Sequence, residues 1–573
     1  MSLDRCLFMA RTPRAAGREE LRERIERLAR WHGGRASWAW VGECGVAGVV
    51  RYDGREESLA EPLVFGEEPS LAEPPASGEA RASAAALLDG TPRLEGATAV
   101  LAVEPSRAGI VAGASGPGTL FEASSGAADA WSTHAVAAAW LAHGRARVDT
   151  KAIPEQLAAE FVGGARTLVE GARALPGGIR VTVADSGARL DDLWPLADRW
   201  APVPEEDAAA HAERALLESL ERRVPGRPHV SLTAGLDSRV VGVALRELGI
   251  GDAHGFTWGE DGWEDVRGGR DLAERLGMPH SLVAIEWLSD DGAFAEVGRQ
   301  VRWNEGAIQV GFARLRWPAA MPGFVTGAGG EVGRAFYYRD SRPPSDEASA
   351  EELVAVLARL LEPRLAGARG EAVEALRASL NGWVDAAAAA GRPGWRTLDV
   401  VYGEQRVRRW LRGMLPRLDA PMIPAFATPE IGRALASLPL ADRVSDGFHR
   451  GYLERHAPEL LPPRPAEPEP RRAGLAELLR RGAPDRLRAR LRTATPSELG
   501  TRWDERPGFR NWIAEGVLGS PLLTEPLGER WARRTRDRFL AGDGQAEAMA
   551  LAAGGPVALA EALVELERTR AGA

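Results

Sequence analysis

The chain has 573 residues, of which 45% are hydrophobic and 27% are charged. A single hydrophobic core does not grow to this size, so we expect two or three domains of an ordinary soluble protein. The net charge of −9, from 81 acidic and 72 basic residues, argues against nucleic-acid binding as the main role, because neutralising phosphates requires clustered cations.

The lysine and cysteine content and the lack of long apolar runs narrow the possible classes of protein further. Lys151 is the only lysine, so we expect no catalytic amine. Cys6 and Cys44 lack the spacing of a metal site, and two cysteines in this length are no disulfide framework. No run of about 18 apolar residues predicts a membrane span, and Met1–Arg11 has no secretory pattern. We therefore expect a cytoplasmic protein without a membrane or nucleic-acid partner.

The first third of the chain mixes helical and strand patterns. Residues Arg18–Trp31 predict a helix, because Leu21, Ile25 and Leu28 share one face. Further elements follow in chain order: a β region at Ser37–Tyr52, a loop with a helix near Arg81–Leu88, a strand at Thr98–Val103, a helix at Ser132–His143 and a strand at Ile179–Ala184. These predict a mixed α/β or α+β domain that ends at the linker Pro202–Pro204.

The second part begins with a helix at Glu206–Arg223, after which strands and helices alternate. The alternation predicts a parallel sheet. Its predicted elements are strand His229–Leu232, helix Arg239–Leu248, strand Ala253–Trp258, helix Asp265–Leu276, strand Ser281–Ile285 and a later strand at Gly323–Thr326. From Ala348 onward the pattern is nearly all helical, interrupted by a Pro-rich linker or surface loop at Leu461–Pro470.

A turn of small residues, Thr233–Ser238, joins the first strand of this sheet to the next helix. Such a turn aims backbone N–H groups and the positive end of the helix dipole at one point, and this arrangement binds anions. Asp237 inside the turn needs a cation, which a Mg²⁺ bridging to phosphate would supply. The G-x-x-x-x-G-K pattern of P-loop proteins is absent. The alternative is that Gly, Asp and Ser serve only as turn and cap residues.

The same run resembles the Ser-Gly-Gly-Leu-Asp-Ser pyrophosphate loop of asparagine synthetases, beta-lactam synthetases and related ATP pyrophosphatases. Thr233 stands at the first Ser and Ala234 at the first Gly, and the next four residues, Gly235, Leu236, Asp237 and Ser238, match. In that family ATP is split between its α- and β-phosphates, and a substrate carboxylate becomes an acyl-adenylate.

Further motifs of this family follow in the same order, so that the resemblance spans roughly residues 205–460. Phe256–Gly259 resembles the strand whose end contacts adenine. Thr326–Glu331 resembles the Ser-Gly-x-Gly-x-Asp loop, which implies that Glu331 is a second Mg²⁺ carboxylate facing Asp237; taken alone, Glu331 is equally a solvated loop acid. The acidic pair Glu264-Asp265, the helix Ala273–Gly277 and His280 also match in order.

Several positions depart from the family pattern. Ala328 stands where the family has a Tyr or Glu that handles the nucleophile or its proton, and Ala420–Ala427 only faintly resembles an acid-bearing segment. Arg450, in Asp446–Leu453, stands at a lysine that steadies the transition state and pyrophosphate, and an arginine can keep that electrostatic role. Glu404, Arg406 and Arg408 either compensate or form an exposed charged face.

The first domain departs further. Glutamine-hydrolysing members expose an N-terminal Cys, whereas here Ser2 would follow Met1, and Cys6 is expected to pack inside a first strand. Trp131–Leu141, with Ile153–Phe161 and Leu175–Gly178, nevertheless resembles the end of the family's glutaminase domain. The resemblance implies a retained fold without glutaminase activity, as in beta-lactam synthetases and lasso-peptide cyclases, which take an internal amine.

The resemblance implies an α/β protein in three parts. Residues 1–203 would be a degenerate Ntn-hydrolase-like glutaminase domain, an α+β sandwich of the class II glutamine amidotransferase type. Residues 204–465 would be a synthetase domain of the adenine-nucleotide alpha-hydrolase-like type, with a parallel sheet, and residues 466–573 its helical extension. The expected partner is a small-molecule or peptide carboxylate, and a homodimer is compatible with the sequence.

The main hypothesis is an ATP- and Mg²⁺-dependent amide-forming ligase. The alternatives are a glutamine-hydrolysing asparagine synthetase that uses Ser2 and a nucleotide-binding pseudoenzyme. The main hypothesis assigns catalysis to Arg450 and Glu331 and the metal to Asp237 and Glu331. It assigns the nucleotide to Leu232, Thr233, Ala234, Gly235, Asp237, Ser238, Phe256, Thr257 and Gly327.

Overall fold

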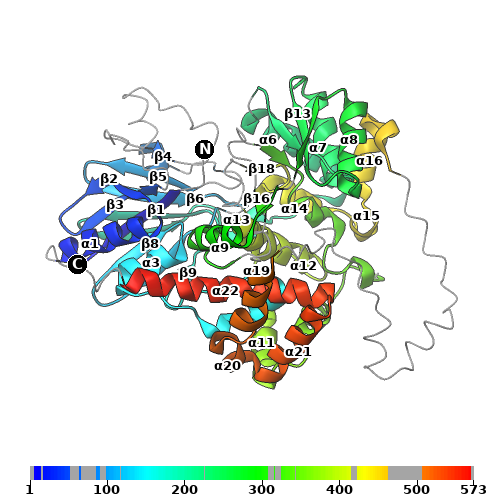
Figure 1. Cartoon of the computed structure of the whole chain (residues 1–573). Helices are drawn as coiled ribbons and strands as arrows, with labels where there is room; N and C mark the ends of the chain where they lie inside the picture. Colours follow the sequence, from blue (N-terminus) through cyan, green and yellow to red (C-terminus); the bar gives the residue numbers. More distant parts are fainter. Residues whose placement is uncertain are drawn as a thin grey trace.

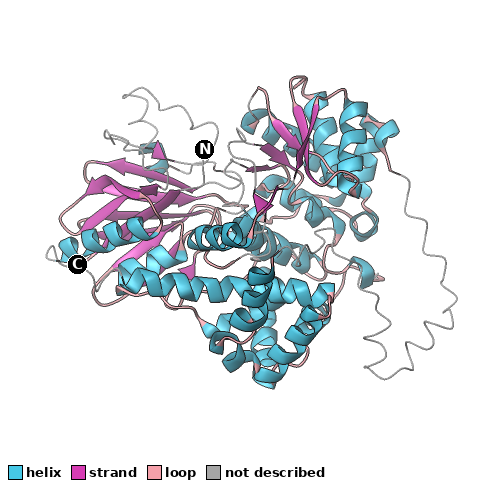
Figure 2. Cartoon of the chain, viewed as in Figure 1, coloured by secondary structure: helices cyan, strands magenta, loops and turns pink. Residues whose placement is uncertain are grey.

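The computed structural model describes residues 5–13, 17–51, 64–65, 85–90, 94, 99–116, 118–224, 226–284, 286–307, 315–316, 324–341, 343–414, 422–462 and 506–568. It is a mixed α/β structure in which strands gather in two regions, one at the left and one at the upper right of Figure 2. Ser2, Ala420, most of the predicted loop at 53–98 and the Pro-rich stretch beyond Pro462 lie outside the described residues.

The first region contains two antiparallel sheets. One has the order β2-β3-β1-β8-β7-β9 and the other β11-β10-β6-β5-β4. The first is formed by β1 (Arg5–Arg11), β2 (Arg35–Val41), β3 (Gly45–Arg51), β7 (Phe121–Ser124), β8 (Asp129–Ser132) and β9 (Arg173–Ala174). The second is formed by β4 (Val64–Phe65), β5 (Ala99–Glu104), β6 (Arg107–Ala112), β10 (Ile179–Ala184) and β11 (Gly187–Asp192).

The alternation along β1 explains how these sheets stack. Leu7 and Met9 join a core with side chains of β5, β6 and β10, whereas Cys6 and Phe8 pack on the opposite face. Helices α1 (Gly17–Trp31) and α3 (Ala135–His143) cover that opposite face, and a helical turn at residues 85–89 packs on the outer face of the second sheet. The layers therefore run helix, sheet, sheet, helix.

The second region contains a parallel sheet with the order β14-β13-β12-β17-β18, as expected from the alternation of strands and helices. Its elements are α6 (Glu205–Arg223), β12 (His229–Ser231), α7 (Leu236–Glu247), β13 (His254–Gly259), α8 (Glu264–Leu276), β14 (His280–Ala284), β17 (Phe324–Thr326) and β18 (Met422–Pro424). The described chain after Ala348 is nearly all helical, as expected, and β18 is the exception. There the buried run Met422–Pro424 pairs with β17 as an outer strand.

Helices connect and surround the two regions (Figure 1). They are α4 (Ile153–Ala159), α5 (Leu196–Arg199), α9 (Asp290–Asn304), α10 (Ala350–Leu361), α11 (Gly370–Ala388), α12 (Arg396–Val401), α13 (Leu411–Met414), α14 (Pro429–Ser437), α15 (Leu440–Ser445), α16 (Gly447–His456), α19 (Pro507–Asn511), α20 (Pro521–Leu527), α21 (Glu529–Leu540) and α22 (Gly544–Arg568). Short elements complete the set. They are the 3₁₀ turns η2 (Thr150–Ala152), η4 (Gly330–Arg334), η5 (Arg339–Ser341), η6 (Glu362–Leu365) and η9 (Pro458–Leu460), the π-helices η7 (Tyr402–Trp410) and η11 (Trp512–Val517), and the antiparallel pair β15 (Glu286–Trp287) and β16 (Leu315–Arg316).

The last helix, α22, ties the end of the described chain to its beginning. The indole N–H of Trp31 in α1 donates to the carbonyl of Ala562 at 2.7 Å. By length and composition α22 is the one helix in the described part that is apolar enough to cross a membrane, and 78% of its apolar window is buried inside the protein. Its apolar surface is therefore already used in packing.

The π-helix η7 joins the two regions through buried charges. Glu404 pairs with Arg199 at 2.9 Å, and Arg408 donates to the carbonyl of Ala114 at 2.9 Å. Arg409 donates to the carbonyls of Val162 and Arg166, at 3.1 and 2.7 Å. The interpretation of Glu404 and Arg408 as an exposed charged face is therefore wrong, because both are buried at the interface between the two regions.

Candidate nucleotide site

The parallel sheet changes direction beside β12. The chain passes from β12 to β13 and β14 on one side, and then returns to β17 and β18 on the other side. In open α/β sheets the crevice beyond the carboxyl ends of the strands at such a switch point is the usual ligand site. The predicted loops Thr233–Ser238 and Thr326–Glu331 follow β12 and β17, so both leave the sheet at this crevice.

The turn after β12 is held by its own hydroxyls. Ser238 Oγ accepts from the Thr233 N–H at 3.2 Å, and Thr233 Oγ1 accepts from the Gly235 N–H at 3.1 Å. The N–H of Ala234 donates to Asp265 in α8 at 3.1 Å. Gly235 is the N-cap of α7 and gives no side-chain cap, so the first turn of α7 keeps donors for an anion. By contrast, the N–H groups of Thr233, Ala234 and Gly235, which the motif predicts to face phosphate, donate hydrogen bonds within the protein.

The Gly-rich turn after β17 lies directly against Asp237. A Cβ atom on Gly327 would lie 2.6 Å from Cβ of Asp237, and one on Gly330 would lie 2.3 Å from Asp237 Oδ1. Glycine is therefore required at both positions for the two loops to approach. The contact brings Glu331, which follows Gly330, close enough to Asp237 for the two carboxylates to repel one another.

Asp237 faces two basic side chains. Its Oδ2 accepts a hydrogen bond from Arg334 Nη1 at 3.0 Å. Nε2 of the buried His449 lies 2.8 Å from Oδ1, but in a direction that makes no hydrogen bond, so Oδ1 accepts none among the described residues. Burial alone would raise the pKa of Asp237, but His449 and Arg334 outweigh it and hold that pKa below its usual value.

Arg334 also belongs to a chain of ion pairs. Its Nε donates to Asp446 Oδ1 at 2.8 Å, and Arg339 donates to both oxygens of Asp446 at 2.7 and 2.8 Å. Asp446 is the N-cap of α16 and adopts a left-handed φ of 61°. The chain Asp237–Arg334–Asp446–Arg339 thus links the start of α7 to η4 and to the start of α16.

Glu331 has a different partner. The Tyr402 hydroxyl donates to its Oε2 at 2.7 Å. Burial, followed by the nearby Asp237 carboxylate, raises the pKa of Glu331. Two partly buried acids that repel one another, one of them with an oxygen that accepts no hydrogen bond among the described residues, form an arrangement that a cation would stabilise.

The donor set fits a magnesium ion that arrives with phosphate. Mg²⁺ is commonly held by one or two carboxylates and completed by phosphate oxygens and water. Asp237 and Glu331 would supply the carboxylates, and Oδ1 of Asp237, 2.8 Å from His449 Nε2, is a buried oxygen that accepts no hydrogen bond among the described residues. In the described part of the chain no group of three or more His, Cys, Asp or Glu side chains could hold a metal by itself.

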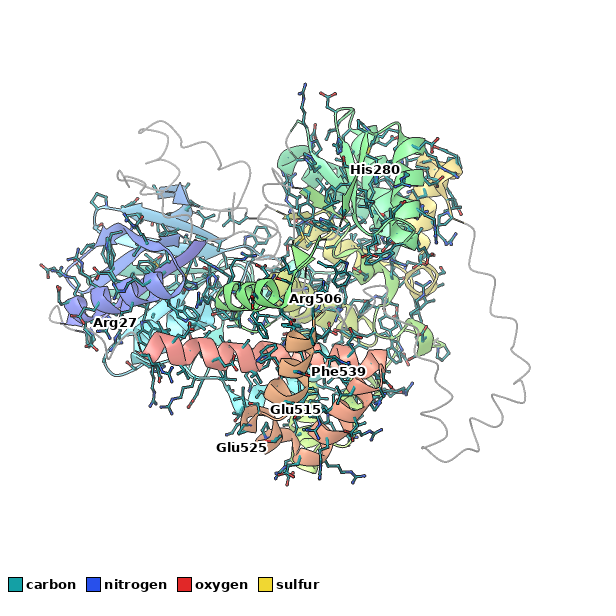
Figure 3. All side chains as sticks on the ribbon, viewed as in Figure 1. Arg27, His280, Arg506, Glu515, Glu525 and Phe539 are labelled. Carbon is teal, nitrogen blue, oxygen red and sulfur yellow. The ribbon has the colours of Figure 1, made fainter. Side chains whose placement is uncertain are left out.

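The residues assigned to the nucleoside are deeply buried. Leu232 donates its N–H to the Phe256 carbonyl at 2.9 Å, and the Phe256 ring packs edge-on against Phe324. Thr257 donates its hydroxyl to the Leu232 carbonyl at 2.8 Å, and the same oxygen lies 2.9 Å from His280 Nε2, a residue labelled in Figure 3. These side chains shape the ends of β12 and β13, and a base would meet mainly their backbone.

Helix α16 presents a different residue from the one the motif singled out. Arg450 donates to the carbonyl of Pro462 at 3.3 Å, and the described residues show no contact between Arg450 and either Asp237 or Glu331. His449, one position earlier, is the residue that reaches Asp237. Sequence reasoning also missed Arg334 and Tyr402. Arg334 lies three residues beyond Glu331, and this proximity was the one signal that could have found it.

Arg406 stands on the same helix as Tyr402, one turn later. Its guanidinium carbon lies 4.9 Å from the ring centres of both Phe336 and Trp410. Among the described residues it makes no hydrogen bond or ion pair, and it is half-buried. Phe336, which also packs on Tyr402, is 42% exposed. A guanidinium without hydrogen bonds among the described residues is thus held one turn from Tyr402, the residue that contacts Glu331.

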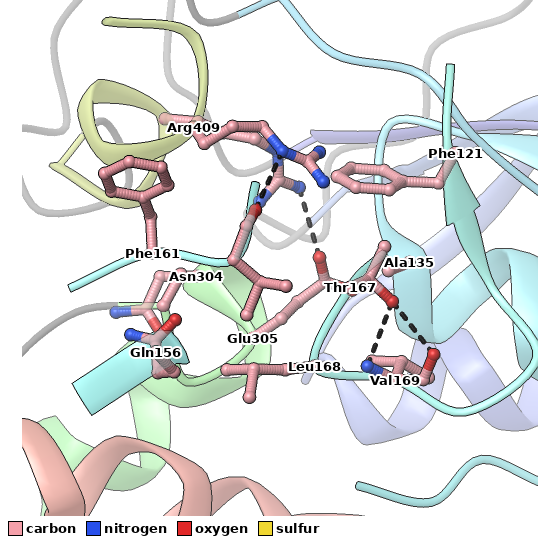
Figure 4. Close-up of a pocket in the computed structure, with 13 residues that line it drawn as sticks. Phe121, Ala135, Gln156, Phe161, Thr167, Leu168, Val169, Asn304, Glu305 and Arg409 are labelled. Atoms are coloured by element: carbon pink, nitrogen blue, oxygen red, sulfur yellow. Dashed lines mark hydrogen bonds and ion pairs between the residues drawn. The ribbon is translucent and has the colours of Figure 1, made fainter. Parts of the chain in front are cut away.

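A separate cavity lies where the first region meets α9 and η7 (Figure 4). Arg409 and Phe121 lie on one side of it, and Gln156 and Glu305 on the other. Glu305 accepts from the Val136 N–H and pairs with Arg412 at 3.3 Å. Most of its charged groups are therefore satisfied within the protein, and the cavity belongs to the interface between the regions.

Compared with known proteins, the chain matches no family model, and no curated protein matches it. The likeness to asparagine synthetases therefore depends on short motifs in a fixed order. The geometry at the switch point of the parallel sheet is an observation that does not depend on these motifs.

Proposed function

We propose that the chain is an ATP- and Mg²⁺-dependent ligase of the asparagine synthetase-like kind that forms an amide bond. A substrate carboxylate oxygen would bond to the α-phosphorus of ATP, the bond from that phosphorus to the bridging oxygen of the β-phosphate would break, and pyrophosphate would leave. An amine would then attack the acyl carbon, lose a proton and release AMP. The observation that carries the proposal is the meeting of Asp237 and Glu331 at the switch point of the sheet.

Each part of the site has a role in this proposal. Asp237 and Glu331 would hold Mg²⁺, which when bound neutralises charge on the phosphates. The turn Thr233–Ser238 and Gly327 would face the phosphates, and the ends of β12 and β13 would face the nucleoside. The positive charge assigned to Arg450 has a nearer counterpart in Arg334, and the ring of His449 also lies against Asp237.

The architecture supports the finer assignment of domains. The helix, sheet, sheet, helix layering of the first region fits the Ntn-hydrolase-like domain proposed for residues 1–203, and the five-stranded parallel sheet fits an adenine-nucleotide alpha-hydrolase-like domain at 204–465. Cys6 is fully buried, and burial raises the pKa of its thiol to about 12, so it does not serve as a nucleophile. In the main hypothesis the amine comes from the substrate or a peptide.

Arg406 fits the carboxylate side of the reaction. A guanidinium matches a carboxylate through two parallel N–H bonds, and stacking between Phe336 and Trp410 holds its plane in place without using its donors. Tyr402, one turn earlier, contacts Glu331, so Arg406 lies one turn from a residue of the proposed site. We assign it to a carboxylate of the substrate.

ATP–pyrophosphate exchange tests the proposal. Labelled pyrophosphate should enter ATP in the presence of a pool of carboxylic acids and short peptides. Asp237→Ala and Glu331→Gln should abolish the exchange. Asp252→Asn, which removes only an exposed surface pair with Arg227, should leave it unchanged. Exchange absent from every pool, or retained in Asp237→Ala, would contradict the proposal.

A second candidate is a protein that binds nucleotide without turning it over. The engaged N–H of Ala234 and the pairing of Asp237 with Arg334 favour it, because both use groups that catalysis would need. Calorimetric binding of ATP with no exchange in any pool would select it. The glutamine-hydrolysing alternative depends on Ser2, and glutaminase activity lost in Ser2→Ala would be its signature.

A further inference from the structure

Arg334 is the one basic side chain among the described residues that bridges Asp237 and Asp446. It is partly buried and is placed by η4, which begins with the Gly-rich turn of the site. Two ion pairs at 3.0 and 2.8 Å fix its guanidinium, with Asp237 on one side and Asp446 on the other. The nucleotide site thus contains a cation of its own.

We infer that Arg334 occupies Asp237 in the nucleotide-free protein, so that the site rejects free divalent cations and accepts a metal only together with nucleotide phosphate. This inference rests on the proposed function, because it takes Asp237 and Glu331 as the acids that hold Mg²⁺. It makes Arg334 a positioning residue that controls the order of binding.

The physical argument begins with the charges. Asp237 and Glu331 are neighbouring, partly buried carboxylates on two loops in contact, and without a cation their repulsion would destabilise the folded site. Arg334 neutralises Asp237, so the site is stable without metal. The same positive charge repels a divalent ion beside it, and the described protein offers too few ligands to offset that repulsion.

Phosphate changes the balance. A nucleotide brings several anionic oxygens, which add ligands to the metal and offset the charge of Arg334. Oδ1 of Asp237 accepts no hydrogen bond among the described residues, although His449 Nε2 lies 2.8 Å from it, so this oxygen can meet the incoming metal while Oδ2 stays with Arg334. Asp446 anchors Arg334 from the other side throughout.

Electron paramagnetic resonance of Mn²⁺ measures this without any turnover. The wild type should bind Mn²⁺ weakly alone and tightly with α,β-methylene ATP. Arg334→Gln should bind Mn²⁺ alone at least about tenfold more tightly, because removing a nearby positive charge is worth more than the 1.4 kcal/mol of a tenfold change. Adding Glu331→Gln to that variant should cancel the gain.

Arg339→Gln is the matched control. This variant also removes a guanidinium that pairs with Asp446, but Arg339 does not contact Asp237. Its Mn²⁺ affinity should stay within about twofold of the wild type, since its charge is more distant and more exposed. An equal gain in Arg339→Gln and Arg334→Gln, or no gain in Arg334→Gln, overturns the inference.

Asp446→Asn tests the same idea with Arg334 retained. Asparagine tolerates the left-handed φ of this position, so the fold should persist. Arg334 would then have only Asp237 as its acid, and Mn²⁺ binding in the presence of the ATP analogue should weaken; unchanged or tighter binding would count against the inference. Absent ATP–pyrophosphate exchange would overturn the ligase but not the control of metal binding, because Mn²⁺ affinity is read without chemistry.

Discussion

The Tyr402 hydroxyl donates a 2.7 Å hydrogen bond to Oε2 of Glu331 and thereby connects the π-helix η7 to the Gly-rich turn of the candidate site. Tyr402 is buried and Glu331 is partly buried, so the hydroxyl has little access to water as an alternative partner. The bond fixes the direction of the Glu331 carboxylate relative to Asp237. Its removal should therefore affect both stability and nucleotide chemistry.

Tyr402→Phe should destabilise the protein by about 1–3 kcal/mol, the cost of leaving a buried acceptor without its donor. It should also slow ATP–pyrophosphate exchange. Urea unfolding and the exchange assay measure the two effects. Tyr452→Phe is the control, because the Tyr452 hydroxyl is buried without a hydrogen-bond partner in the described structure and its loss should cost little. Equal losses in the two variants would contradict the role of the Tyr402 bond.

Arg409→Met should weaken the junction of the two regions. Arg409 supplies donors to the carbonyls of Val162 and Arg166, and removing them should cost about 3 kcal/mol in the free energy of unfolding. Hydrogen exchange at residues 162–167 should accelerate. Arg406→Met, on the same helix, removes no hydrogen bond and should change stability far less. Unchanged hydrogen exchange at residues 162–167 in Arg409→Met would show that other contacts hold the junction of the two regions.

Arg406 has its own expected effect on substrate. Once exchange has identified a carboxylate, Arg406→Met should raise KM for it about tenfold with little change in kcat, because a paired guanidinium contributes mainly to binding. Arg406→Lys should recover only part of the loss, since an ammonium keeps the charge but not the planar fork. A fall in kcat at constant KM would assign Arg406 to the chemistry instead.

Acid should destabilise the protein through a buried histidine. Burial, followed by the charge of Arg302, lowers the pKa of His32 from its usual value of 6.5 to about 3. Between pH 6.5 and about 3 the unfolded chain binds a proton at His32 and the folded chain does not. The contribution of His32 to the free energy of unfolding is therefore fully present above pH 6.5 and falls as the pH drops toward 3. The loss should approach about 1.4 kcal/mol per pH unit. Unfolding curves of wild type and His32→Phe at pH 7.5 and 5.5 should diverge accordingly, and parallel curves would refute the effect.

Thiol labelling separates the two cysteines. Cys6 is buried in β1 against Ser132, and burial raises its pKa to about 12, whereas Cys44 is partly exposed. Iodoacetamide at pH 8 should therefore modify Cys44 in the native protein and both residues in urea. Modification of native Cys6 would reopen the question of a cysteine nucleophile in the first region.

Local patterns predicted the strands and helices that form the site. The strand predicted at His229–Leu232 and the helix predicted at Asp265–Leu276 agree closely with β12 and α8, since apolar periodicity and small-residue turns are local signals. The approach of Glu331 to Asp237 followed from motif order. Strand β18 was missed because its three buried residues are shorter than any periodic pattern.

The partners of the site acids could not be predicted in the same way. Motif alignment placed Arg450 at the site, but neighbouring residues on a helix point about 100° apart, and α16 turns His449 toward Asp237 instead. Tertiary packing decides that rotation. Glu404 and Arg408 were assigned to a solvated face because charge in a helix usually indicates one, and the docking of the first region overrides it.

The nine residues of η7 wind more widely than the α-helices before and after it. Side chains at its start contact the acids beside the parallel sheet, and side chains at its end contact the first region. The number of residues per turn in η7 therefore sets the rotation about the helix axis between these two groups of side chains. Losing one residue here would tighten the turn to α-helical geometry and rotate everything downstream by about 100° relative to Tyr402. Related chains should accordingly tolerate exchanges of residue type in this segment much more readily than changes in its length.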